Sequence, residues 1–545
     1  MKFKTFLSSL GLSFVVAVAL VSSAQEHTPL SAAKAEFDKA RALPFGDKDA
    51  VASYRKAIDL DPDFYAAHEY YILAYSNAGA PPSATDEEKK TARKKAHKEL
   101  DGLYQGWAKE HPDRAVYQWA LGSLWEYDNP DKSVQYCKEA IKLDPKYGPA
   151  YDMLSIAAEE HGDLELSREY ARKGHEAWPD NITIWRHYLG TFTAAGNTPD
   201  LEKAKEIGLQ MAEKFPSHGT YMLGYIAGRS TDEKQTRELY ELLWQKFPKA
   251  ATGSTLMPLF DIYMKTDRAK ALGLAEEMVR SDPANKDWPL LKAYAQTVLD
   301  AEGLIAEDKA ADAIAALDKV KLPRLTDRRV LDLAQAKALD ASGQTEKAYT
   351  NLASAFAKTP SDEAHSALLG YGKKLGKDAQ QMDADIWAQR SASAKPGIPF
   401  SLVNYATGKP VSTDQYKGRV FLVNFWYPKC GPCRGEFPYL EAALEKYKSQ
   451  GFEILAINGH PPEDEWVMPL IKGWRLQFAP LKGTEEVLKA YNISGMPTNF
   501  LYGPDGRIYP MPSQVRPATL REFELQVEAL LQQAKSATPA GQKSN

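Results

Sequence analysis

Two patterns of apolar and polar residues divide this chain of 545 residues. Over the first two-thirds, small and aromatic residues recur at helical intervals, and prolines follow the helical segments. These prolines lie 32 to 37 residues apart, at Pro112, Pro145, Pro179, Pro216, Pro248 and Pro283. Because proline cannot continue a helix, each one marks a stop. The pattern predicts an array of paired helices over residues 31–377.

From Ile398 onward the pattern changes to strands that alternate with helices. Arg419–Trp426 is a continuous apolar run, which is typical of a strand covered on both faces. Glu436–Tyr447 has the spacing of an amphipathic helix, and Phe452–Asn458 is a second buried strand. The sequence therefore predicts a multidomain protein, in which an all-α solenoid precedes an α/β domain over residues 398–534.

Two short segments border the α/β domain. Residues 378–397 contain Ser-Ala-Ser-Ala-Lys-Pro-Gly, a small-residue composition that favours a linker. Residues 535–545 are small and polar, and we expect them to form a disordered tail.

The helical array resembles the tetratricopeptide repeat, whose period is about 34 residues. Ala50, Tyr54 and Ala57 stand before Pro62 at the distances that this family uses, where small residues let paired helices approach. The interval from Pro62 to Pro112 is roughly sixteen residues longer than one repeat, so the match is degenerate. The resemblance implies an extended concave surface that binds protein segments.

The first 24 residues have the pattern of a secretory signal peptide. Lys2 and Lys4 precede the mostly apolar stretch Leu10–Val21, and Ala24 supplies a small residue at the cleavage site. An uncleaved membrane anchor is the alternative, but the apolar stretch is shorter than the ~20 residues that a span requires. We expect an exported protein, periplasmic in a bacterium, with no membrane span in the mature chain.

Charge gives no evidence for a nucleic-acid or membrane-surface partner. The chain carries 68 Lys and Arg against 72 Asp and Glu, a formal net charge of −4. Binding to nucleic acid or to an anionic membrane needs a concentrated basic face, which this balance does not predict.

The chain contains only three cysteines, which excludes a framework of structural disulfides. Cys137 falls where helical repeats bury a medium-sized side chain, so we expect it to behave as a small hydrophobic residue. A role for Cys137 as a redox partner is the alternative. The remaining two, Cys430 and Cys433, form a Cys-x-x-Cys motif.

This motif lies between a buried strand and a helix, the position of a redox motif. The first sulfur would then lie at the helix N-terminus, where backbone N–H groups favour a thiolate, and the second would lie one turn on. Cys430 would attack a disulfide and Cys433 would resolve the mixed disulfide. Zinc would need a second ligand pair, haem attachment would need His where Arg434 stands, and a structural bridge over so short a loop would add little stability.

Several motifs together resemble the thioredoxin fold over residues 398–532. They are Trp426 ahead of Cys-Gly-Pro-Cys, the helix proline Pro438, and Gly-Met-Pro-Thr at 495–498. The opening hairpin pattern and Cys-Arg-Gly-Glu-Phe-Pro resemble the exported TlpA/ResA subgroup in particular. The resemblance implies that Pro497 is cis and lies beside the disulfide, that the Met496 backbone pairs with an extended substrate, and that Trp426 belongs to the substrate site.

Some positions depart from the plain thioredoxin pattern. Asn424 stands where that family has a buried aspartate, so Glu436 becomes the candidate acid/base for Cys433. Lys429 directly precedes Cys430, and a cation there is expected to favour the thiolate. Pro432 completes the dipeptide of strongly reducing thioredoxins. A surface glutamate is the alternative for Glu436, and we interpret His460 as a loop residue.

The leading hypothesis is therefore a thiol–disulfide oxidoreductase that reduces protein disulfides, with the helical array recruiting clients. It needs a thiol electron donor that this chain does not encode, and no cofactor or metal. One alternative is a repeat-based adaptor that uses the thioredoxin fold only for docking. Another is a peroxiredoxin-type peroxidase, whose chemistry uses Thr or Ser where Tyr427 stands.

Overall fold

The computed structural model describes residues 27–537, except residues 45, 80–83, 127–128, 194–198, 249–250, 252–253 and 325. These residues form two compact units. One runs up to Tyr151 and includes Lys173–Asn181, and the other comprises Asp152–Arg172 and everything from Ile182 onward. The predicted signal peptide, residues 1–24, and residues 538–545 of the predicted tail lie outside the described residues.

The first unit is built from helices that pack as successive neighbours: α1 (Ser31–Arg41), α2 (Lys48–Leu60), α3 (Tyr65–Ala78), α4 (Asp86–Glu110), α5 (Ala115–Trp125) and α6 (Pro130–Leu143). The long helix α4 accounts for the extra residues between Pro62 and Pro112. It begins with a capping box, in which the side chains of Thr85 and Glu88 satisfy each other's backbone N–H groups.

Cys137 lies on α6 and is buried against α5. A Cβ atom on Gly122 of α5 would come within 2.7 Å of the Cys137 sulfur, so the two helices approach at this glycine. Burial raises the pKa of the Cys137 thiol to about 12. The thiol therefore stays protonated and belongs to the packing of this helix pair.

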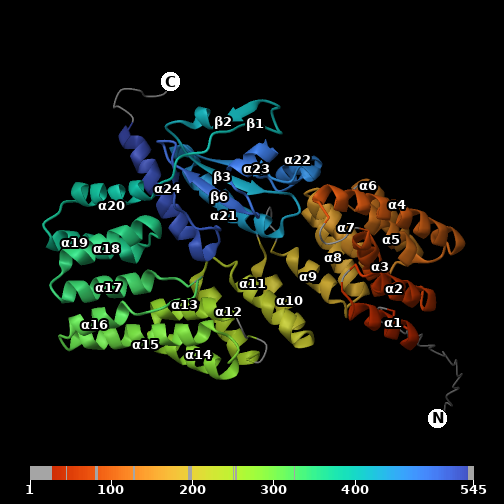
Figure 1. Ribbon diagram of the computed structural model, residues 1–545, viewed down its shortest axis with the longest axis horizontal. Helices are drawn as coiled ribbons and strands as arrows, with labels where there is room; N and C mark the ends of the chain where they lie inside the picture. Colours follow the sequence, from red (N-terminus) through yellow and green to blue (C-terminus); the bar gives the residue numbers. More distant parts are fainter. Residues whose placement is uncertain are drawn as a thin grey trace, which may run out of the picture. The chain divides into compact units, whose positions relative to one another are not determined.

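The helical part of the second unit includes the corner between α7 (Gly148–Glu160) and α8 (Leu164–Ala177). It continues through α9 (Ile182–Gly190), α10 (Leu201–Lys214), α11 (Pro216–Ala227), α12 (Glu233–Lys246), α13 (Met257–Thr266), α14 (Arg268–Ser281), α15 (Asp287–Ala306), α16 (Ala310–Leu317), α17 (Arg329–Ala341), α18 (Thr345–Lys358), α19 (Asp362–Lys374) and α20 (Ala379–Ser393), shown from yellow to green in Figure 1.

The recurring prolines lie at a constant distance from the helix ends. Helices α4, α6, α8, α10, α12 and α14 each end two residues before one of them, and α18 ends two residues before a further proline, Pro360. Pro216 also opens α11, where its missing N–H costs nothing because the first turn of a helix has no acceptor for it. The array is therefore all-α, with the proline spacing marking its hairpins.

Helix α20 occupies most of residues 378–397, the segment expected to be a linker. Asp378 and Gln381 form a capping box at its start, and Met382 and Ile386 are buried on its inner face. The Pro/Gly composition that suggested a linker is confined to the end of the segment, after the helix. Similarly, the last helix, α24 (Pro517–Ala537), extends into the predicted tail.

The α/β domain contains a five-stranded sheet in the order β5-β4-β3-β6-β7. Its strands are β3 (Val420–Trp426), β4 (Phe452–Asn458), β5 (Ala479–Lys482), β6 (Thr498–Tyr502) and β7 (Ile508–Tyr509), and β1 (Ser401–Val403) and β2 (Pro410–Ser412) form a separate hairpin. Strands β3, β4 and β5 are parallel, whereas β6 and β7 are antiparallel to their neighbours. The combination of an all-α array with this domain confirms the predicted fold class.

Both faces of the central strand β3 are buried, as its continuous apolar sequence predicts. Val420, Leu422 and Trp426 face the helices α21 (Gly431–Tyr447) and α24, which Figure 1 shows beside the sheet. Phe421, Val423 and Phe425 pack on the other face, against residues of the β1–β2 hairpin and α23 (Glu485–Ala490). The sheet is thus a rigid core, with the carboxyl ends of its parallel strands meeting at one edge.

Within the described residues, no helix has the length and apolar character needed to cross a bilayer.

Candidate redox site

The Cys-x-x-Cys motif lies where the buried strand β3 ends and α21 begins. Cys430 is the N-cap residue of α21, and its Sγ atom accepts the backbone N–H of Cys433 at 3.2 Å. The two sulfurs form a disulfide, and Cys430 and Cys433 are 2% and 0% exposed. When the disulfide is reduced, the same N–H and the helix dipole would stabilise a thiolate on Cys430.

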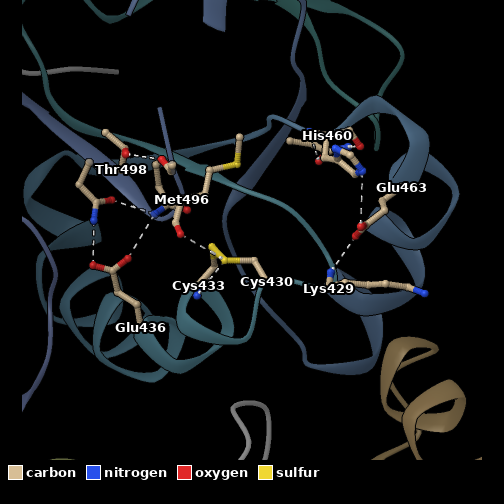
Figure 2. Close-up of a disulfide and its surroundings, with 12 residues drawn as sticks. Lys429, Cys430, Cys433, Glu436, His460, Glu463, Met496 and Thr498 are labelled. Atoms are coloured by element: carbon tan, nitrogen blue, oxygen red, sulfur yellow. Dashed lines mark hydrogen bonds and ion pairs between the residues drawn. A yellow bond between two sulfur atoms is a disulfide. The ribbon is translucent and has the colours of Figure 1, made fainter. Parts of the chain in front are cut away.

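The loop before β6 forms the other side of the disulfide. The Met496–Pro497 peptide bond is cis, and the Met496 carbonyl oxygen lies 3.7 Å from the Cys430 sulfur. Figure 2 shows Met496 directly beside the disulfide, with Thr498 to the left of it. The site therefore brings together Cys430, Cys433, Met496 and Pro497 from segments that are more than sixty residues apart in sequence.

Glu436 lies one turn after Cys433 on α21 and is 1% exposed. Its Oε1 atom accepts the side-chain N–H of Asn499 at 2.8 Å and the backbone N–H of Val515 at 2.5 Å. Burial raises the pKa of this carboxyl to about 7, even though these hydrogen bonds favour the ionised form. Glu436 can therefore bind or release a proton near neutral pH.

Asn424 completes the polar network below the disulfide. Its side-chain N–H donates to Asn499 Oδ1 at 2.8 Å and contacts Glu436 Oε2 at 3.5 Å. Asn424 and Asn499 are directly opposite each other in the β3–β6 register. A buried carboxylate needs donors of this kind, because an isolated buried charge is costly.

The comparisons with known proteins agree with this geometry. Residues 395–511 match the model of the AhpC/TSA family. Over 121 residues the chain is 33% identical to the thiol-disulfide oxidoreductase ResA of Bacillus subtilis, covering 22% of this chain and 67% of ResA. Over 127 residues it is 32% identical to ResA of Geobacillus thermodenitrificans, covering 23% of this chain and 72% of that protein. The chain belongs to the ResA-like thiol-disulfide oxidoreductases.

The chain spans about two-thirds of the length of the ResA proteins that it matches. A crystal structure of a thiol:disulfide interchange protein of the thioredoxin family from Chlorobium tepidum is 27% identical and covers 25% of this chain and 97% of that one, with a TM-score of 0.22.

Two further residues predicted for the ResA-like site have clear positions. Trp426 is fully buried at the end of β3 and stacks edge-on against Phe437, at 5.2 Å between ring centroids. It supports the disulfide from inside the core and presents no surface to a substrate in this conformation. Pro432 is exposed in the first turn of α21, beside the exposed Gly431.

Lys429 is held on the side of its loop away from the disulfide. Its backbone N–H donates to Glu463 at 2.8 Å, and its ammonium lies 4.1 Å from the centroid of the Trp466 ring and 3.4 Å from Glu160 of α7. Figure 2 shows its side chain extending away from Cys430. The predicted effect of this cation on the Cys430 thiolate is therefore opposed by a carboxylate partner.

His460 is half exposed in the loop after β4. Its ring lies 5.5 Å from that of Tyr427, between centroids, and its Nε2 atom is 3.8 Å from Glu463. No contact places it on the disulfide, which matches its interpretation as a loop residue.

Sequence reasoning missed the partners that hold the candidate site residues: Glu160, Glu463, Asn499 and Val515. A signal existed for Asn499, because it and Asn424 are isolated amides in two apolar strands. Backbone donors such as Val515, and carboxylates from distant segments such as Glu160, leave no comparable local pattern. Within the described part of the chain, no three His, Cys, Asp or Glu residues are placed to hold a metal ion.

Proposed function

We propose that this protein is an exported disulfide reductase that acts on protein clients through Cys430 and Cys433. The observation that supports it best is the position of the Cys430 sulfur. It caps a helix N-terminus, its partner sulfur is one turn on, and the carbonyl oxygen of the partly buried Met496 lies 3.7 Å from it. Export is supported by Lys2, Lys4 and the apolar stretch that follows them.

In this proposal the reduced enzyme delivers two electrons to a client disulfide. The Cys430 thiolate attacks one client sulfur, and the other client sulfur leaves as a thiolate. Glu436 then accepts the proton of Cys433, whose sulfur attacks Cys430 and releases the second client thiolate. The Cys430–Cys433 disulfide that results is reduced again by an external dithiol donor.

The helical array is proposed to bring clients to this site. An array of helical hairpins presents an extended surface to other proteins, and it makes up most of this chain. A protein that acted only on small thiols would have no evident use for such a surface.

Reduction of insulin by the full-length protein, with dithiothreitol as donor, tests the proposal. We expect insulin precipitation well above the uncatalysed rate, and no acceleration by a Cys430→Ser variant. The Glu276→Gln variant is a matched control, because Glu276 pairs with Lys292 in the helical array. If the wild-type protein were as slow as the Cys430→Ser variant, the reductase proposal would be abandoned in favour of an adaptor.

The AhpC/TSA match to residues 395–511 makes peroxide reduction a second candidate. Oxidation of the reduced protein by hydrogen peroxide, followed through tryptophan fluorescence, separates the two. We expect the disulfides of insulin or of oxidised glutathione to react with the reduced protein much faster than peroxide does, because Tyr427 stands where a peroxidase would place a Thr or Ser hydroxyl. Preferential reaction with peroxide would favour the peroxidase.

A further inference from the structure

The corner between α7 and α8 packs closely against the redox domain within the same compact unit. Gly162 at this corner has φ +80°, and a Cβ atom on Gly162 would come within 3.0 Å of the Pro469 carbonyl oxygen in α22 (Asp464–Gly473). A Cβ atom added to either Gly162 or Gly473 would clash with the backbone of the other glycine. Leu164, next to the corner, joins the core of the redox domain.

Two carboxylates at the end of α7 reach the two cations that flank the cysteine pair. Glu160 lies 3.4 Å from the Lys429 ammonium, and Glu159 lies 3.1 Å from the Arg434 guanidinium. The side chains of Glu160 and Lys429 are only 6% and 12% exposed, so solvent screens this pair little. The two cations belong to the redox motif, and the two anions belong to the helical array.

The contacts made by Lys429 leave its ammonium few alternative positions. Trp466 lies under it as a cation–π partner, and Glu463 holds the backbone of the same residue. Without Glu160, the four-carbon side chain could turn toward solvent or toward the neighbouring sulfur. The charged and titratable groups near the cysteine pair include Lys429, Arg434 and Glu436 from the motif and α21, Glu159 and Glu160 from α7, and His460 and Glu463 from the loop after β4. Arg229, from the segment after α11, adds a further cation, because its guanidinium donates to the Gly435 carbonyl oxygen of α21.

We propose that Glu160 is a positioning residue for the redox pair: it holds the Lys429 ammonium against Trp466 and so keeps this cation from stabilising the Cys430 thiolate. The helical array thereby sets the charge beside the attacking sulfur. With this carboxylate in place, the pKa of the Cys430 thiol is higher than it would be without it. The Cys430–Cys433 disulfide is correspondingly harder to reduce. The proposal rests on the proposed function only in taking Cys430 as the attacking sulfur.

Reactivity of Cys430 in the reduced full-length protein provides the test. Its alkylation by iodoacetamide is followed between pH 5 and 9, with the modified peptide identified by mass. We expect Glu160→Gln to lower the apparent pKa of Cys430 and to raise its alkylation rate at neutral pH about three- to tenfold, the effect of one nearby cation. The ratio of disulfide to dithiol in a glutathione buffer should fall by a similar factor.

A double-mutant cycle distinguishes positioning from a simple field effect. If Glu160 acts through Lys429, Glu160→Gln should have less than half of its effect in the Lys429→Met background. Equal effects in both backgrounds, or no effect in either, would overturn the proposal. Glu160→Asp should restore most of the wild-type behaviour, and Glu276→Gln should change nothing.

Gly473→Ala offers an independent variant that alters no charge. The added methyl group would displace the α7–α8 corner and its carboxylates, so we expect Cys430 to become more reactive, as in Glu160→Gln. An unchanged pH profile in Gly473→Ala, with the protein folded by circular dichroism, would also contradict the proposal. These measurements need no client turnover, so their outcome is separable from that of the insulin assay.

Discussion

The proton-accepting role of Glu436 can be tested through the pH dependence of mixed-disulfide resolution. Glu436→Gln keeps the size of the side chain and its acceptor oxygen for Asn499 and Val515, but it removes the ionisable group. With a pKa of about 7, the wild-type carboxyl is about 10% ionised at pH 6 and about 90% ionised at pH 8. Base-assisted resolution should therefore rise about tenfold over this range and then level off.

The variant has no such base, so its resolution rate should follow the ionisation of the Cys433 thiol itself. We expect a slope of about tenfold per pH unit that continues past pH 8, and a rate at pH 7 that is lower by about 10- to 100-fold. The difference between the two proteins should shrink as the pH rises, because hydroxide then deprotonates the thiol without help.

The assay is single-turnover release of the second client thiol, measured in a stopped-flow instrument after the mixed disulfide has formed. Reaction of Cys430 with iodoacetamide serves as a control, because it reports the first thiol and should change little. Superimposable pH profiles for wild type and Glu436→Gln would refute the assignment and leave Glu436 as a buried structural carboxyl.

Four further outcomes are expected. Cys433→Ala should accumulate a client-linked disulfide at Cys430, visible on non-reducing gels, whereas Cys430→Ser should accumulate none. Cys137→Ala should reduce clients at the wild-type rate in the insulin assay, because a buried protonated thiol does not attack disulfides. Phe437→Ala should cost about 3–5 kcal/mol in denaturant unfolding of the redox domain, since the ring is fully buried among aromatic neighbours. Burial raises the pKa of Glu522 to about 7. The stability that the protonated Glu522 carboxyl contributes to the fold is therefore present below pH 4.5 and is lost as the pH rises through 7. Glu522→Gln removes this titration, so it should reduce the fall in Tm between pH 6 and 8.

The main features of the fold follow from local chemistry. Proline cannot continue a helix, so the regular prolines located the ends of the helices in the array. The continuous apolar run before Cys430 is typical of a strand buried on both faces, and the structure places alternate residues of β3 in two core clusters, one on each face. The segment 378–397 was harder to predict, because α20 depends on burial of Met382 and Ile386 against distant helices.

The residues of the candidate site likewise include some that local sequence predicts and some that depend on distant segments. Cys430 and Cys433 follow from their spacing and their place after a strand. Glu436 could be proposed from its place one turn after Cys433, but its burial depends on the sheet and on the loop that contains Val515. The surroundings of Lys429 could not be predicted, because they come from Glu160, which is nearly 270 residues away in the sequence.

The contact between Gly162 and Gly473 has a practical consequence for anyone who isolates the redox domain. A fragment that starts at Ile398 lacks α7 together with its two terminal carboxylates. Lys429 and Arg434 would then face water without those anions, and the apolar surface under Leu164 would be uncovered. Rate constants and reduction potentials measured on such a fragment would describe a more cationic active site than the one that the whole chain assembles.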